Sequence, residues 1–180
     1  MADASGWLPF VTLALGYGAK TVEDWIQNKR TMAREREARD EARRDQRFIR
    51  RITFQRETLL ELQEASLQLA RATGKAHYLD EMAFRESRAW RKSLLPDDLD
   101  EGYRVAQARN SMLSERVQDK TVRDLVGQMK TASTAAVFAA DRDTASRSVQ
   151  YMSDYFDALH KRIGELLREI DSSDQLEIGQ

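Results

Sequence analysis

The residues of this chain that could perform chemistry are two histidines and the carboxylates near them. His77 and Glu81 are one helical turn apart in one segment, and Asp157 and His160 are three residues apart in another. Imidazole and carboxylate groups bind Zn²⁺ or iron, so these four residues are candidate metal ligands if two helices bring them to one level. The set is incomplete for a di-iron bundle, because the chain contains no Glu-x-x-His motif.

Other catalytic motifs are absent from the sequence. It contains no Gly-x-x-x-x-Gly-Lys phosphate loop and no Gly-x-Ser-x-Gly nucleophile elbow. It also contains no cysteine, which excludes disulfides, thiolate metal ligands and cysteine nucleophiles. We therefore expect a non-enzymatic protein without a cofactor.

The composition predicts an all-α fold. Charged residues make up 33% of the 180 residues, and only two prolines and eight glycines interrupt the chain. This balance favours long, solvated helices. No segment alternates apolar and polar residues in the way that a half-buried strand does.

Residues 1–26 form the most apolar segment and are predicted to be a membrane anchor. Ala4–Ala19 carries no charge, and a helix would place Trp7 and Trp25 about 27 Å apart, close to the thickness of the hydrocarbon core. The candidate anchor residues are Trp7, Phe10, Leu13, Leu15, Tyr17 and Trp25, and Ala14 with Gly18 forms a small-residue pair suited to a close helix contact. The apolar run is shorter than a typical membrane-spanning helix. Burial of this segment in the chain's own oligomer or in a partner protein is therefore the alternative.

Residues 27–47 are predicted to form a charged helical stalk. The range Lys29–Arg51 holds ten Lys and Arg against five Asp and Glu, in a chain whose net charge is −1. A basic excess after an apolar segment favours the cytoplasmic side. We thus expect an inner (cytoplasmic) membrane protein with its bundle in the cytoplasm, and a soluble cytoplasmic protein as the alternative. We do not expect nucleic-acid binding, because acids interrupt the basic residues and no aromatic residue of the stalk precedes Phe48.

Residues 48–171 are predicted to fold as an antiparallel, coiled-coil-like bundle of three helices. The second helix is expected over residues 99–140, although the sequence allows a break near Asp119, and its small-residue end, 131–140, is expected to pack tightly and to form no site. The third helix, which Asp141 or Asp143 is expected to cap and which ends at about Asp171, carries a strict seam with alternating spacings of three and four: Val149, Met152, Phe156, Leu159, Ile163, Leu166 and Ile170. Residues 172–180 are predicted to be a disordered tail.

This three-helix layout has two consequences. A third helix parallel to the first would place His160 at the level of residues 74–78, beside His77. A second helix that ends at the level of about residue 54 would leave an apolar stripe of Phe48, Ile52 and Leu59 without cover from its own chain. We therefore expect a homo-oligomer that associates through this stripe.

Together these patterns predict a membrane-tethered helical scaffold that self-associates and binds an unidentified protein partner. The alternative is a soluble assembly subunit whose apolar N-terminus is buried in its own oligomer or in a partner. A metal-binding helical bundle is a more distant alternative.

Overall fold

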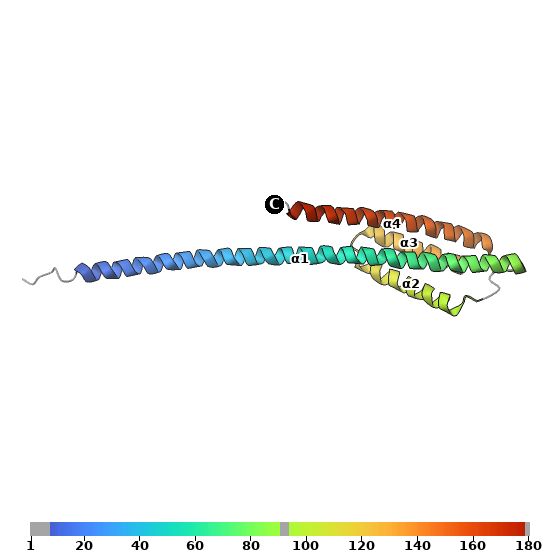
Figure 1. Ribbon diagram of the computed structural model, residues 1–180, viewed down its shortest axis with the longest axis horizontal. Coiled ribbons are helices and arrows are strands. Elements are labelled where there is room, and N and C mark those ends of the chain that lie inside the picture. The colour runs from blue at the N-terminus through green and yellow to red at the C-terminus, as the bar shows by residue number, and fades with distance from the viewer. Residues whose placement is uncertain (1–7, 91–93, 179–180) are drawn as a thin grey trace, which may run out of the picture. The chain divides into compact units, whose positions relative to one another are not determined.

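The structure is a computed structural model. It describes the backbone of residues 8–90 and 94–178, and the side chains of residues 28–172 except 30, 33 and 91–93. The described part contains four helices: α1 (Leu8–Ser87), α2 (Asp97–Arg116), α3 (Lys120–Val137) and α4 (Arg142–Ile178) (Figure 1). The predicted all-α fold class is confirmed. The chain divides into two units, Met1–Arg50 and Arg51–Gln180.

The first unit contains the N-terminal part of α1. Its described side chains are exposed, and Glu35 pairs with Arg39 at 3.3 Å, an exposed ion pair of the kind that adds little stability. The predicted anchor residues, together with Ala14 and Gly18, lie outside the described side chains. Where the structure describes the chain, no helix is both long enough and apolar enough to cross a membrane.

The second unit is a bundle in which successive helices alternate in direction. Three contacts between α1 and α4 fix their relative direction: Glu81 with Arg142 at 2.6 Å, Ser66 with His160 at 2.9 Å, and Arg56 with Asp171 at 3.5 Å. Residue numbers fall along α1 as they rise along α4, so these two helices are antiparallel. Figure 1 shows α2, α3 and α4 lying along the part of α1 that belongs to the second unit.

Contacts of α2 complete the topology. Lys75 and Asp98 are 3.8 Å apart at one end of the α1–α2 pair, and Gln55 donates to the carbonyl of Arg116 at 3.0 Å at the other end. The α2 and α3 helices are antiparallel as well, because Tyr103 contacts Thr134 while Ser111 bonds to Lys130. The second unit is therefore an up-down-up-down four-helix bundle.

The predicted bundle of three helices is thus corrected to four, because the chain turns at residues 117–119 where one helix was expected to continue. Val117 is buried and has an extended backbone. Asp119 is the N-cap of α3, and its Oδ1 accepts from the backbone N–H of Val122 at 2.8 Å. Its Oδ2 accepts from Arg162 of α4 at 2.8 Å. One carboxylate therefore both starts α3 and attaches α4 to the turn.

These bonds stabilise the ionised form of the Asp119 carboxyl group. Partial burial alone would raise the pKa of this carboxyl, but the bonds from Arg162 and from the Val122 N–H outweigh burial and lower it. The same ion pair, with a further bond to Glu165, raises the pKa of Arg162. Arg123 supports the turn from the other side, because its guanidinium donates to the carbonyls of Val117 and Gln118 at 2.6 and 2.8 Å.

The core lies between the four helices. Its fully buried large hydrophobic side chains come from α1, α3 and α4 and include Leu62, Leu69, Met129, Leu159 and Ile163. Within the predicted seam of α4, the residues Met152, Leu159 and Ile163 are buried, whereas Val149, Phe156, Leu166 and Ile170 are half-buried. The helix also continues to Ile178, past residue 172, where the sequence predicted a disordered tail.

Buried polar side chains join three helices at two levels of this core. Thr73 of α1 and Ser133 of α3 are both fully buried, with their hydroxyls 2.6 Å apart. Ser133 donates to the Tyr103 hydroxyl at 3.3 Å. Asn110 of α2 is also fully buried and donates to the carbonyl of Ala65 at 2.8 Å. Buried polar groups that bond to specific partners disfavour a shifted register, because a shift would leave them without partners.

We predict that Asp119→Ala lowers the free energy of unfolding by about 1–3 kcal/mol, because it removes both the helix cap and the partner of Arg162. Asp119→Asn keeps a capping oxygen and loses the ion pair, so its loss should be smaller. Urea denaturation followed by circular dichroism at 222 nm measures both. A loss below about 0.5 kcal/mol for Asp119→Ala, the range of ordinary surface sites, would contradict this role.

Candidate functional site

The structure does not bring the four candidate metal ligands together. His160 bonds to Ser66, which lies eleven residues before His77, or about 16 Å along the helix. The expected alignment of the two histidines is therefore wrong, because the turn at residues 117–119 makes α4 antiparallel to α1. No group of three or more His, Asp or Glu side chains that could hold a metal ion occurs among the described residues.

His77 and Glu81 instead lie where α1 meets the connection between α3 and α4. Arg142 donates to Glu81 at 2.6 Å, and this bond lowers the pKa of the Glu81 carboxyl. The rings of His77 and Trp90 are 5.9 Å apart, and the Trp90 indole donates to the carbonyl of Ala139 at 3.2 Å. These contacts fasten the end of α1 to the α3–α4 connection, which is a structural role.

Ser66 and His160 have the spacing of a nucleophile and its general base, since Ser66 Oγ and His160 Nε2 are 2.9 Å apart. However, Ser66 has no exposed surface, and its hydroxyl donates to the carbonyl of Gln63 at 2.8 Å. A substrate carbonyl cannot reach this hydroxyl in the structure. The pair therefore acts as a packing contact between α1 and α4, extended by the Phe156 ring, 4.1 Å from the His160 ring.

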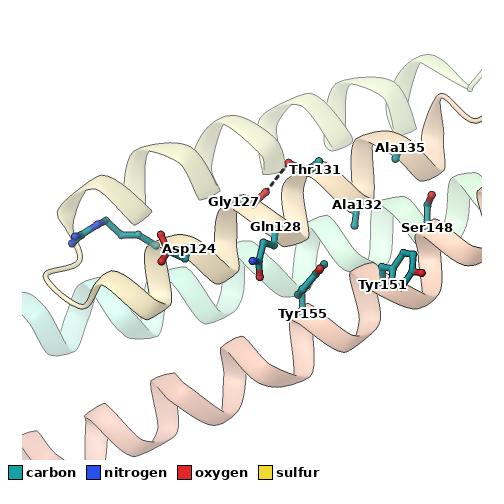
Figure 2. A pocket seen from close by; sticks show the side chains of 10 residues that line it. Asp124, Gly127, Gln128, Thr131, Ala132, Ala135, Ser148, Tyr151 and Tyr155 are labelled. Atoms are coloured by element: carbon teal, nitrogen blue, oxygen red, sulfur yellow. Dashed lines mark hydrogen bonds between the residues drawn. The ribbon is translucent and has the colours of Figure 1, made fainter.

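The best candidate for a binding surface is a groove between α3 and α4, with a volume of about 690 Å³. Figure 2 shows α3 supplying one side of this α3–α4 groove and α4 the other. The α3 side is made of Arg123, Asp124, Gly127, Gln128, Thr131, Ala132 and Ala135, and the α4 side is made of Ser148, Tyr151 and Tyr155.

Small side chains on α3 are the reason that this groove exists. Gly127, Thr131 and Ala135 are spaced four residues apart on the exposed side of α3, so one face of the helix carries almost no side-chain bulk. Tyr151 and Tyr155 project from α4 beside them. The sequence prediction that residues 131–140 form no site missed this groove, because Ala132 and Ala136 pack inward while Thr131 and Ala135 lie exposed.

The polar groups of the groove are largely without partners inside the chain. Ser148 is only 8% exposed, yet its hydroxyl has no hydrogen bond to any described residue. The same holds, within the described part, for the Tyr151 and Tyr155 hydroxyls and for the Gln128 amide. By contrast, Asp124 pairs with Lys120 at 2.6 Å, and Thr131 bonds to the carbonyl of Gly127. Among the described side chains, the buried polar atoms that lack a partner are His77 Nδ1, Glu81 Oε2 and Asn110 Oδ1, and none of these residues lines the groove.

The predicted oligomer stripe of Phe48, Ile52 and Leu59 is not a set of three exposed residues. Leu59 is only 2% exposed and belongs to the bundle core, so its own chain covers it. Ile52 is half-buried in the second unit, and Phe48 is exposed in the first unit. Leu59 fails as an interface residue because α2 and its turn extend to Gln55, which bonds to both Arg116 and Gln118.

We predict that acid destabilises the bundle through His160. Burial lowers the pKa of this imidazole, and the nearby Asp157 opposes that effect only in part. The unfolded chain therefore binds the proton more readily, so stability is present above about pH 6.5, the ordinary pKa of histidine, and is lost as the pH falls below it. Urea denaturation between pH 7.5 and 5.5 should show a steeper loss for the native sequence than for His160→Gln. Equal slopes would contradict this assignment.

The chain matches no protein-family model, no curated protein and no solved structure. Comparison with known proteins therefore assigns no function to the residues described above.

Proposed function

We propose that this chain is a non-enzymatic helical scaffold that self-associates and binds other proteins, and that residues 1–26 tether it to a membrane. The observation that supports an interaction role best is the α3–α4 groove, a recessed surface between small residues of α3 and two tyrosines of α4. The described histidines and buried hydroxyls serve contacts between helices, such as Ser66 with His160 and Thr73 with Ser133.

The tether is proposed from the sequence. It is motivated by the uncharged run Ala4–Ala19 with Trp7 and Trp25 near its ends, followed by the basic excess of residues 29–51. That order favours an inner-membrane location with the bundle in the cytoplasm. The alternative is a soluble assembly subunit whose apolar N-terminus is buried in its own oligomer or in a partner.

We predict that the full chain fractionates with membranes and resists extraction by alkaline carbonate, and that deletion of residues 1–26 releases it. Deletion of residues 173–180 is the matched control and should leave the fractionation unchanged. Recovery of the full chain in the soluble fraction without detergent would contradict the tether and favour the soluble assembly subunit.

We also predict that the full chain self-associates in mild detergent. Sedimentation velocity between about 1 and 100 μM should show a mass that increases with concentration, as a reversible oligomer requires. A monomer over the whole range would contradict self-association.

A further inference from the structure

We propose that α1, over residues 29–50, lies along the surface of a membrane and binds the phosphate groups of anionic phospholipids through one arginine-rich face. The inference rests on the proposed membrane tether and adds the lipid class, the residues in contact and the direction of the helix. Residues 29–50 all belong to the first unit, and their described side chains are exposed.

The helix gathers on one face basic residues that the sequence intersperses with acids. At about 100° of rotation per residue, six basic residues of this range fall within a sector of about 80°. They form the basic stripe: Lys29, Arg36, Arg39, Arg43, Arg47 and Arg50. None of the acids in residues 29–50 lies inside this sector. Asp40 borders one edge, and Glu35 borders the other, where it pairs with Arg39 at 3.3 Å. The basic stripe is therefore a continuous positive line about 32 Å long.

The side chains of the basic stripe suit phosphate. All but Lys29 are arginines, and a planar guanidinium group can bind two phosphate oxygens at once. Arg36 and Arg50 have no ion pair with any described residue, and Arg47 donates through Nε to the backbone carbonyl of Arg43 at 3.1 Å. These guanidinium groups are therefore available to an anion from outside the chain.

A membrane fits the basic stripe better than a nucleic acid does. The helix α1 runs without a break from Leu8, so the stripe continues the helix that carries the proposed tether. An apolar segment and a basic patch are together the two signals that stable membrane binding needs. The one further residue within the sector is Met32, whose side chain is 54% exposed. An apolar side chain suits the boundary between headgroups and acyl chains, and the sector has no aromatic ring on which bases could stack.

The length of the basic stripe determines how the helix must lie. A helix perpendicular to the membrane would hold Arg50 about 32 Å farther from the surface than Lys29, well beyond the screening length of about 8 Å at physiological ionic strength. Only a helix along the surface brings the whole stripe to the phosphates. The uncharged run Ala4–Ala19 agrees with this direction, because it is shorter than the about 20 residues that cross the hydrocarbon core.

The first test is cosedimentation of the full chain with vesicles of phosphatidylcholine alone and of phosphatidylcholine with about 30% phosphatidylglycerol. At about 50 mM salt the native chain should bind the anionic vesicles at least about tenfold more tightly, and about 0.5 M salt should remove most of this preference. Equal binding to both kinds of vesicle would overturn the inference and leave the tether standing. Binding to neither would overturn both.

Two exchanges of charge separate the basic stripe from net charge. Arg43→Glu with Glu41→Arg moves a positive charge to the opposite side of the helix, and Arg34→Glu with Glu37→Arg exchanges two charges that both lie outside the stripe. Both double variants keep the composition and net charge of the native chain, and all four positions are exposed. The first exchange should reduce the preference for anionic vesicles at least about fivefold, and the control exchange by less than about twofold. Equal effects of the two exchanges would overturn the inference.

Fluorescent labels test the direction of the helix. The chain has no cysteine, so Asp40→Cys places one label at the edge of the basic stripe, and Ala38→Cys places one on the opposite side at nearly the same distance along α1. On anionic vesicles, a quencher attached to the lipid headgroups should quench the label at residue 40 more strongly than the label at residue 38. Equal quenching would overturn the inference, because a perpendicular helix holds both labels at the same height.

Duplex DNA is the competing ligand, compared with the anionic vesicles at equal phosphate concentration and equal salt. The native chain should bind the vesicles more tightly than the duplex. Tighter binding to the duplex that is lost in the exchange of Arg43 with Glu41 would overturn the inference and assign the basic stripe to nucleic acid.

Discussion

The bonds of the Asp119 carboxylate determine the architecture of the second unit. Through one oxygen it caps α3, and through the other it holds Arg162 of α4. The chain therefore reverses at residues 117–119, and every later element runs opposite to the direction that an unbroken helix would give. The antiparallel α1–α4 contacts and the α3–α4 groove depend on this reversal.

The sequence predicted the all-α fold and the seam on α4 because both depend on local periodicity. It allowed a break near Asp119 but did not establish one, since the second partner of Asp119, Arg162, is 43 residues away. Because this turn was not predicted, the predicted positions of the candidate metal ligands were also wrong. The predicted alignment of His77 with His160 came from counting residues along three helices. With the added turn, His160 lies beside Ser66 instead.

The groove was missed for a different reason. A small-residue segment such as Thr131–Ala140 gives the same pattern whether it packs inward or leaves a recess at the surface. The signal that could have indicated a surface is Gly127, a glycine inside a helical pattern. Its meaning depends on the empty space around it and on the direction of Tyr151 and Tyr155, which only the packing of α4 defines.

The antiparallel direction of α4 relative to α1 is the central feature of this bundle. Pulsed electron spin resonance on the cysteine-free chain can measure it with spin labels at residue pairs 56/171 and 56/142. We expect a short distance for 56/171, since Arg56 and Asp171 are in contact. We expect a distance for 56/142 that is longer by roughly 40 Å, the length of the intervening part of α4. A short 56/142 distance with a long 56/171 distance would contradict the antiparallel bundle, because that result requires α4 to run parallel to α1.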